Sequence, residues 1–354
     1  MKGIHLIGHG GFEKLVLNLD IPKPEPKNDE VLIKVSAAGI NNTDINTRIG
    51  WYSKSVTTDT NDGGEKGFAS SNDKDATWSG NALKFPRIQG ADICGKIISV
   101  GKDVDQSRVG ERVIVRSMQS DPNNLQKISS YVIGSEIDGG FAEYVAVRSS
   151  ESFKIDSDWS DVELASIPCA YSTAEGMLHR VNLKNEKVLI TGASGGVGSA
   201  AIQLAKRRGA FVIAQCSKSK FEDIKKIGAD EVADRNEDLI NKLGINKIDV
   251  VVDLVAGSNW KQLLDILKPG GRYVTAGAIA GPIVNLDIRT LYLKDLTFYG
   301  CTYQPLEIFK NLIKYIENNE IKPLIAKTFP LEKIVDAQKE FLSKKFIGKI
   351  VLEI

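Results

Sequence analysis

Apolar and polar positions divide the chain into two parts with different periodicities. Up to about Val147, short β-branched runs such as EVLIKVSAAGI and ERVIVRS are broken by Gly and Pro, which predicts an all-β region. From about Asp161 to Lys310, apolar strands such as VLITG alternate with amphipathic helical stretches such as SAAIQLAKRRG. This alternation predicts βαβ units on a parallel sheet with right-handed crossovers. The chain ends on another strand-like run, GKIVLEI, which we expect to rejoin the first part.

The stretch from Trp51 to Phe85 interrupts the first pattern. It is rich in Gly, Ser, Asn, Asp and Thr and contains few apolar residues. Because such a composition cannot pack a core of its own, we expect a long insertion or a mobile loop there.

Composition narrows the class of protein. A chain of 354 residues is long enough for two domains, and 42% hydrophobic with 26% charged residues is typical of globular enzymes. Lys+Arg 46 and Asp+Glu 45 are interspersed, which disfavours a nucleic-acid partner and favours a small molecule.

Features that report on the compartment point to the cytoplasm. The opening stretch, Met1 to Ile21, carries charged residues and histidines inside its apolar pattern, unlike a signal or transit peptide. No apolar run approaches the length of a membrane span. The four cysteines are far apart and form no CxxC pair, which suits a reducing environment.

A Gly-rich turn carries the strongest local signal. The segment KVLITGASGGVGSAAIQLAKRRGAFVIA runs from an apolar strand through this turn into a helix and then into a second strand. A phosphate needs backbone N–H groups at a helix N-terminus with no Cβ in the way, and Gly at these spacings provides that. We therefore predict a dinucleotide-binding turn. The residues expected to contact the cofactor there are Gly192, Ser194, Gly195, Gly196, Val197 and Gly198.

The end of the second strand indicates which dinucleotide binds. NAD enzymes hold the ribose 2′-OH with an acid at this point, whereas Ser217, Lys218 and Lys220 stand here instead. The nearby acids Glu222 and Asp223 fall in the following helix, where they complement its N-terminal dipole. We therefore expect NADPH. The alternative is that the two lysines form a solvated helix start.

Seven segments occur in a characteristic order along the chain: GHGGFEKLVL, VLIKVSAAGINNTDINTRIG, PRIQGADICGKIISVG, IDGGFAEYVAV, ASIPCAYSTAEGML, the Gly-rich turn with QLAKRRGA, and FIGKIVLEI. Together they resemble the medium-chain dehydrogenase/reductase superfamily and, within it, the zinc-independent quinone oxidoreductase branch. The resemblance implies an α/β chain with a GroES-like β-barrel catalytic domain and a Rossmann-type doubly wound parallel-sheet domain, and an active site in the cleft between them. It implies the boundaries 1–155 for the catalytic domain with a polar insertion at 51–85, 156–318 for the nucleotide-binding domain, and 319–354 for the return to the catalytic domain.

The zinc-ligand positions of this superfamily are altered. Where zinc members resemble GxCxxD this chain has Asn41 in place of the Cys, and where they resemble GHE it has Ala91 in place of the His. Cys169 keeps a thiol at the third position, but one soft ligand cannot assemble a three-ligand open site. The structural four-cysteine lobe is missing too, because no Cys occurs between Gly101 and Tyr144. We expect no metal, and interpret Cys169 as a small buried hydrophobe.

Chemistry without a metal restricts the substrate. Hydrogen-bond donors must then polarise the acceptor carbonyl as hydride leaves the nicotinamide. A quinone or an α,β-unsaturated carbonyl accepts hydride at carbon, whereas an unactivated alcohol needs a metal or a strong base. We therefore expect an NADPH-dependent quinone or enone reductase. Two alternatives stay open: an alcohol dehydrogenase-type enzyme on an unknown alcohol or aldehyde, and a non-catalytic NADPH-binding or sensing protein.

The resemblance also implies site residues. The segment AGINNTDINTRIGWY lines the site in the family, which makes Asn41, Thr43, Asp44, Arg48 and Tyr52 the catalytic candidates. Asn41 and Tyr52 are donor candidates, Asp44 is an orienting acceptor, Arg48 is equally a structural ion pair, and Tyr52 is alternatively an ordinary loop aromatic. Outside the Gly-rich turn, the implied cofactor contacts are Thr173 near the nicotinamide, Ala256 and Gly257 under the adenosine ribose, Gly277 and Ala278 at the nicotinamide ribose, and Lys349 at a phosphate. The family also implies a homodimer.

Overall fold

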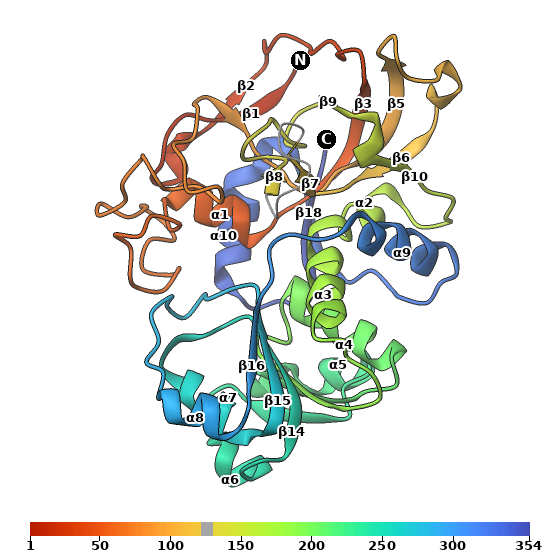
Figure 1. The fold of residues 1–354 in the computed structure, drawn as a ribbon. Coiled ribbons are helices and arrows are strands. Elements are labelled where there is room, and N and C mark those ends of the chain that lie inside the picture. The colour runs from red at the N-terminus through yellow and green to blue at the C-terminus, as the bar shows by residue number, and fades with distance from the viewer. Residues whose placement is uncertain (122–129) are drawn as a thin grey trace. The chain divides into compact units, whose positions relative to one another are not determined.

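The structure is a computed structural model that describes residues 1–121 and 130–354, and the chain forms two compact units. The first unit comprises Met1–Val56, Asn61–Cys169 and Phe309–Ile354, and the second comprises Thr57–Thr60 and Ala170–Ile308. The chain passes from one unit to the other within helix α3 (Pro168–Arg180) and within helix α9 (Leu306–Glu317). Figure 1 shows the course of the chain through both units.

The first unit is built mainly on antiparallel strands, and only β17 and β18 among its named strand pairs run parallel. Its main sheet has the order β10-β6-β5-β3-β18-β17, with β9 also paired to β3, while β2-β1-β4 and β7-β8 form smaller sheets. The strands are β1 (Gly3–Leu6), β2 (Leu15–Asn18), β3 (Glu30–Gly39), β4 (Arg87–Ile88), β5 (Cys94–Val100), β6 (Arg112–Val115), β7 (Met118–Ser120), β8 (Ser130–Val132), β9 (Tyr144–Arg148), β10 (Ser152–Lys154), β17 (Ile325–Pro330) and β18 (Lys349–Glu353). The C-terminal strand β18 runs antiparallel to β3, with Leu352 opposite Ala38.

Helices and the insertion complete this unit. The helices are α1 (Asn42–Ile49), α2 (Asp161–Leu164), the larger part of α9, and α10 (Ile334–Ser343). Within 51–85 no helix or strand forms, yet four aromatic or aliphatic side chains from its two ends and its middle pack against the core of β1, α1, α10 and β18: Trp51, Phe68, Leu83 and Phe85. The insertion therefore shares the core of its neighbours, because it lacks the apolar residues for one of its own.

The second unit holds a six-stranded sheet in the order β13-β12-β11-β14-β15-β16, and every neighbouring pair is parallel. Its strands are β11 (Lys187–Ile190), β12 (Phe211–Cys216), β13 (Glu231–Asp234), β14 (Ile248–Asp253), β15 (Leu267–Thr275) and β16 (Thr297–Gly300). Central strands are continuous apolar runs because helices cover both faces. The predicted doubly wound parallel sheet is confirmed, and its strand order reverses between β11 and β14.

The helices of this unit are most of α3, then α4 (Gly196–Arg207), α5 (Phe221–Lys226), α6 (Leu239–Leu243), α7 (Trp260–Ile266) and α8 (Ile288–Leu293). Figure 1 shows α7 and α8 on one side of strands β14–β16, with α4 and α5 on the other. Trp260, Leu263 and Leu264 of α7 belong to the same buried apolar cluster as Leu189 and Val251 of the sheet.

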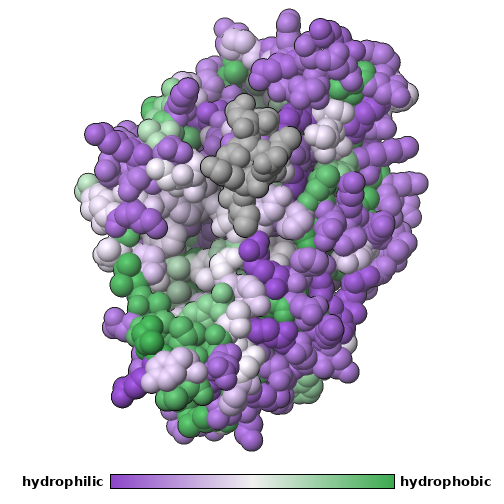
Figure 2. All heavy atoms as spheres, viewed as in Figure 1, coloured by the Kyte–Doolittle hydropathy of each residue, from purple (hydrophilic) through white to green (hydrophobic). Residues whose placement is uncertain are grey.

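The surface of the second unit carries an apolar patch on and next to α8. Ile283, Ile288 and Leu293 expose 59–70% of their surface, and green residues gather there in Figure 2. Among the described residues, no helix combines the length and apolar character that a membrane crossing requires.

Candidate functional site

The Gly-rich turn lies between β11 and α4, at the point where the strand order reverses. Gly192 has φ of 58°, in the left-handed region that favours Gly. A Cβ on Gly198 would lie 2.3 Å from the Gly192 carbonyl oxygen and 2.6 Å from Ala193 Cα, so only Gly lets α4 approach the turn this closely. The first N–H groups of α4 have no partner within the helix and can bind a phosphate. This Cβ-free cradle fits a dinucleotide.

Polar and basic side chains gather where β12 ends. Ser217 precedes a short 3-10 turn that holds Lys218 and Lys220. The Lys220 ammonium donates to Ser194 Oγ at 3.1 Å, which brings a cation to the Gly-rich turn. Burial lowers the pKa of Lys220 from its ordinary value, and the positive charge of Arg235 adds to that shift. Two cations, Lys220 and Arg235, thus lie beside a turn that can bind a phosphate. Such a pair can neutralise a further phosphate group of the same ligand.

One carboxylate near this turn is missed by sequence reasoning. Asp234 ends β13 and is in register with Cys216 of β12. Its Oδ2 accepts from the Lys218 N–H at 3.2 Å and its Oδ1 from the Asn236 N–H at 3.0 Å. The local sequence does not predict this position of Asp234, because only the pairing of β13 with β12 brings it to the end of β12.

Asp253, at the end of β14, is a second carboxylate that the sequence reasoning missed. It is fully buried, and its Oδ1 accepts from the Thr191 hydroxyl at 2.6 Å and the Val255 N–H at 3.0 Å. Its Oδ2 accepts from the Tyr273 hydroxyl at 2.7 Å. Burial and the carboxylate raise the pKa of Tyr273, which keeps the phenol protonated as a donor. Asp253 thus anchors the loop that follows β14. An acidic residue at the end of an apolar strand is the sequence feature that could have pointed to it.

The expected ribose contacts lie at the carboxyl ends of β14 and β15, where doubly wound sheets bind their ligands. Ala256 and Gly257 turn sharply, with φ of 54° and 73°. A Cβ on Gly257 would lie 2.6 Å from the Ala280 carbonyl oxygen, so the loop closes on the segment after β15. In that segment the Gly277 carbonyl accepts from the Thr275 hydroxyl at 3.0 Å.

Two other residues that were expected to contact the cofactor, Ala278 and Thr173, also lie in the second unit. The Ala278 carbonyl accepts from the Gly281 N–H at 3.1 Å, which closes the turn after β15. Thr173 lies on α3, and its hydroxyl accepts from the Gln304 amide at 3.4 Å. These residues stand in the same unit as the Gly-rich turn.

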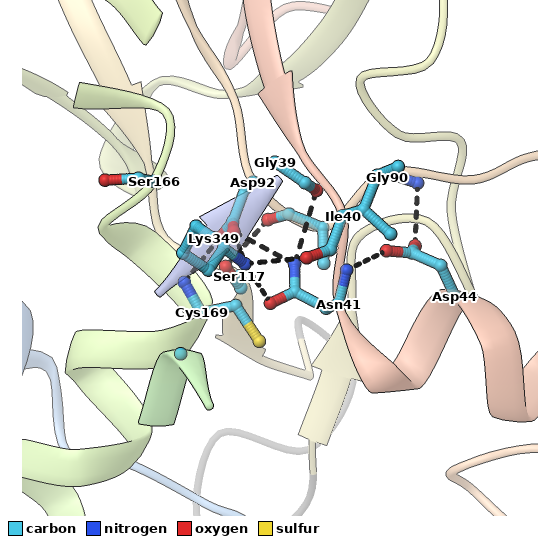
Figure 3. A network of polar contacts seen from close by, with 12 residues as sticks. Gly39, Ile40, Asn41, Asp44, Gly90, Asp92, Ser117, Ser166, Cys169 and Lys349 are labelled. Carbon is cyan, nitrogen blue, oxygen red and sulfur yellow. Dashed lines mark hydrogen bonds and ion pairs between the residues drawn. The ribbon is translucent and has the colours of Figure 1, made fainter. Parts of the chain in front are cut away.

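In the first unit, a buried polar network lies at the start of α1 (Figure 3). The Lys349 ammonium donates to Asp92 Oδ2 at 2.8 Å, to the Ile40 carbonyl at 2.9 Å and to Asn41 Oδ1. The Asn41 amide donates to Asp92 Oδ2 at 2.9 Å and to the Gly39 carbonyl at 3.3 Å. Asp92 Oδ1 accepts from a backbone N–H of α3, and its side chain is 0% exposed.

This network corrects two expectations. An ammonium has three N–H donors, and all three of Lys349 are bonded inside the first unit, so it has no donor left for a phosphate. Both N–H groups of the Asn41 amide are also bonded, so Asn41 cannot donate to a substrate carbonyl. Both residues hold the start of α1 instead. The sequence could not anticipate this, since Lys349 lies more than 250 positions from both Asn41 and Asp92.

Asp44 caps α1. Its Oδ2 accepts from the Asn41 N–H at 2.8 Å and its Oδ1 from the Gly90 N–H at 3.2 Å. Burial raises the pKa of Asp44 to about 7, against the lowering effect of the Asn41 N–H and of Lys349. The carboxyl therefore connects α1 to the segment that carries Gly90 and Ala91.

Thr43 and Tyr52 are brought together. Burial raises the pKa of the Tyr52 hydroxyl above its ordinary value, against the lowering effect of the Thr43 and Asn46 side chains. Trp78, from the insertion, donates its indole N–H to Thr43 Oγ1, and the Tyr52 and Trp78 rings lie 5.5 Å apart. Sequence reasoning missed Trp78 because it stands in a polar stretch with no periodicity.

Arg48 is corrected to a structural residue. Its side chain is fully buried, and its Nε donates to Gln338 Oε1 at 2.8 Å. Its two Nη atoms donate to the Gly10 carbonyl at 2.9 Å and the Gly64 carbonyl at 2.7 Å. Arg48 therefore ties α1 to α10, to the N-terminal turn and to the insertion, and presents no nitrogen to a substrate.

The residues at the zinc-ligand positions do not fit a zinc ion. Asn41 is engaged in the network above and Ala91 has no ligand atom. Cys169 is a partly buried thiol, and among the described residues no group of three His, Cys, Asp or Glu side chains can hold a metal. A catalytic zinc needs three protein ligands.

Comparison with known proteins identifies the class. Residues 196–318 match the family model described as zinc-binding dehydrogenase, and residues 67–157 match the alcohol dehydrogenase GroES-like domain. Quinone oxidoreductase from Lama guanicoe is 29% identical, over 99% of this chain and 97% of that protein. Acryloyl-coenzyme A reductase from Sulfurisphaera tokodaii is 28% identical, over 94% and 95%.

A solved structure shares more of the sequence. A provisionally named alcohol dehydrogenase from Sinorhizobium meliloti is 44% identical, with a TM-score of 0.89, over 100% of this chain and 96% of that one. The predicted fold class, a GroES-like domain with a Rossmann-type sheet, is confirmed. The fold and the Gly-rich turn define an NAD(P)-dependent oxidoreductase. The chain belongs to the medium-chain dehydrogenase/reductase superfamily.

Proposed function

We propose that this protein is an NADPH-dependent oxidoreductase that reduces quinones or α,β-unsaturated carbonyls without zinc. The observation that carries the proposal is the pair of hydroxyl-bearing side chains of Thr43 and Tyr52, which both contact Trp78, on a unit whose zinc-ligand positions hold Asn41 and Ala91. The relatives named quinone oxidoreductase and acryloyl-coenzyme A reductase support this substrate class.

The chemistry needs a hydride and a proton. Bound NADPH supplies the hydride, which goes to an electrophilic carbon conjugated with the acceptor carbonyl. The Tyr52 hydroxyl donates a hydrogen bond to the acceptor oxygen and then its proton, and solvent restores the phenol. Because burial raises the pKa of Tyr52, the hydroxyl stays protonated until the acceptor oxygen gains charge. One NADPH and one proton are consumed for each two-electron reduction.

The choice of NADPH rests on the end of β12. Lys220 is held against Ser194 of the Gly-rich turn, and Arg235 lies near enough to shift its pKa. We propose that these cations bind the 2′-phosphate, together with Ser217 and Lys218. Asp234 is the opposing consideration, but its carboxylate already accepts two backbone N–H groups.

A second candidate function is oxidation of an alcohol or reduction of an aldehyde. It is favoured by one observation, the 44% identity to the Sinorhizobium meliloti protein that is named as an alcohol dehydrogenase. The lack of a fitting zinc-ligand set among the described residues weighs against it, because an alcohol must lose its hydroxyl proton as hydride leaves.

Steady-state assays on the purified protein separate these functions. We expect NADPH oxidation with naphthoquinones or conjugated enones, and little NADP⁺ reduction with alcohols. Tyr52→Phe should lower kcat about 100-fold or more, as loss of a general acid does. Tyr144→Phe is the matched control, since Tyr144 lies on β9 under the Lys23 ammonium. Preferential alcohol oxidation, or equal effects of the two substitutions, would refute the proposal.

We also propose a homodimer. The exposed apolar residues Ile283, Ile288 and Leu293 lie in the same unit as β16, an edge strand of the six-stranded sheet, and edges of this kind favour association. Light scattering after size-exclusion chromatography should give twice the chain mass; a monomer at micromolar concentration would contradict it.

A further inference from the structure

The insertion brings an aromatic side chain to the proposed proton donor. Trp78 stands in the turn-rich stretch that follows α1 in sequence, and its indole N–H donates to Thr43 Oγ1. Its ring centroid lies 5.5 Å from that of Tyr52, with the planes inclined by 50°. The Tyr52 ring also meets Trp51 edge-on, at 5.7 Å and 71°. The insertion, which contains no helix or strand, thus places two tryptophan rings against the Tyr52 ring.

The directions of the hydrogen bonds around Tyr52 follow from which side-chain atoms can donate and which can accept. An indole nitrogen can only donate, so Thr43 Oγ1 is the acceptor for Trp78 and its own O–H must point elsewhere. The Thr43 and Asn46 side chains each lower the pKa of Tyr52, as groups that donate to the phenol oxygen do. A phenol oxygen that accepts from two donors keeps its own O–H for a third partner. Within residues 1–121 and 130–354, no hydrogen bond donated by Tyr52 is found.

We propose that Trp78 is a positioning and specificity-determining residue for the reductase reaction. Its N–H orients Thr43 so that the Tyr52 O–H is left to donate to the acceptor oxygen, and its ring selects acceptors with a flat conjugated ring over short acyl chains. The inference rests on the proposed function and refines its substrate class to quinones and aryl enones. The proton that Tyr52 gives to the oxygen is replaced from solvent, and the hydride comes from NADPH.

A pair of substitutions separates the two roles of Trp78. Trp78→Phe keeps a ring and removes the N–H, so kcat should fall about tenfold for every acceptor with KM little changed, a fraction of what a general acid contributes. Trp78→Leu removes the ring as well. It should in addition raise KM for menadione about fivefold, while KM for methyl vinyl ketone stays as in Trp78→Phe, since a lost aromatic contact is worth about 1 kcal/mol.

Trp159→Phe is the matched control. Trp159 is also partly buried in the first unit, but it lies at the turn before α2, where its carbonyl accepts from Arg112. Its kinetics should equal those of the wild type. Equal behaviour of Trp78→Phe and Trp159→Phe would overturn the positioning role, and an equal rise in KM for both acceptors in Trp78→Leu would overturn the specificity role.

A spectroscopic test stands apart from turnover. The chain has four tryptophans, and the indole N–H signal that Trp78→Phe removes is that of Trp78. This signal should move upfield in Thr43→Val, which loses the acceptor oxygen, and stay in place in Thr43→Ser, which keeps it. It should also shift on titration with acetophenone and not with 2-butanone, with NADP⁺ present.

The outcomes distinguish this inference from the proposed function. If the wild type reduces no quinone or enone, the proposed function fails, and the donor role of Tyr52 fails with it. If turnover is present but the Trp78 signal ignores both Thr43→Val and acetophenone, the proposed function stands and the role of Trp78 is refuted.

Discussion

Removing the buried ammonium of Lys349 should destabilise the first unit far more than removing the whole charge pair. Lys349 and Asp92 expose 4% and 0% of their side chains, and their charged atoms lie 2.8 Å apart. In Lys349→Met the Asp92 carboxylate keeps the Asn41 amide and one backbone N–H but loses its counter-charge. A buried carboxylate without a counter-charge is costly because water no longer solvates it.

The expected magnitude comes from the burial of this pair. Breaking a buried ion pair on one side costs about 3–5 kcal/mol, whereas an intact pair contributes little net stability because desolvation offsets attraction. Lys349→Met should therefore lose about 3–5 kcal/mol at pH 7. Adding Asp92→Asn removes the stranded charge, so the double variant should be more stable than the sum of the single changes by about 2 kcal/mol.

Urea unfolding of the wild type, the two single variants and the double variant, followed by circular dichroism at a fixed protein concentration, measures this coupling. Among the described residues, Lys349 is the only cation in an ion pair with Asp92, so the cycle isolates this pair. Additivity of the two substitutions within about 0.5 kcal/mol would refute the view that these charges depend on each other.

Three further predictions concern the other parts of the site. Burial raises the pKa of Asp44 from 3.8 to about 7, so the folded chain holds this proton more tightly than the unfolded chain; stability should therefore fall as the pH rises between these two values, by up to about 1.4 kcal/mol per pH unit, and Asp44→Asn should flatten that slope in urea unfolding. Lys220→Ala should weaken NADPH binding about tenfold to a hundredfold in fluorescence titrations and leave NADH unchanged; equal losses for both would contradict a 2′-phosphate contact. Gly198→Val should abolish binding of both dinucleotides while far-UV circular dichroism keeps its shape, because the new Cβ meets the Gly192 carbonyl at 2.3 Å; retained affinity would show that the cradle is not the site.

Much of the fold could be predicted from local patterns. Continuous apolar strands alternating with amphipathic helices are a local property, and they indicate a parallel sheet before any long-range contact is known. The Gly-rich turn is local in the same way, since the requirement for no Cβ at Gly198 arises from residues a few positions away. The presence of Asn41 and Ala91 at two zinc-ligand positions of the superfamily can likewise be recognised from the sequence alone.

The roles of individual side chains depended on contacts between distant parts of the chain. Lys349 was expected at a phosphate from the family resemblance. The return of the last strand to the first unit was predicted, but not its pairing with β3, which places the ammonium between Asn41 and Asp92. The role of Trp78 could not be predicted, because a stretch without helix or strand periodicity does not indicate which way its side chains point. Sequence alone thus determined the class of protein and the cofactor-binding turn, since both follow from short-range geometry. Tertiary structure decided which polar side chains, such as those of Lys349 and Arg48, are already satisfied by hydrogen bonds, because these bonds join residues that only folding brings together.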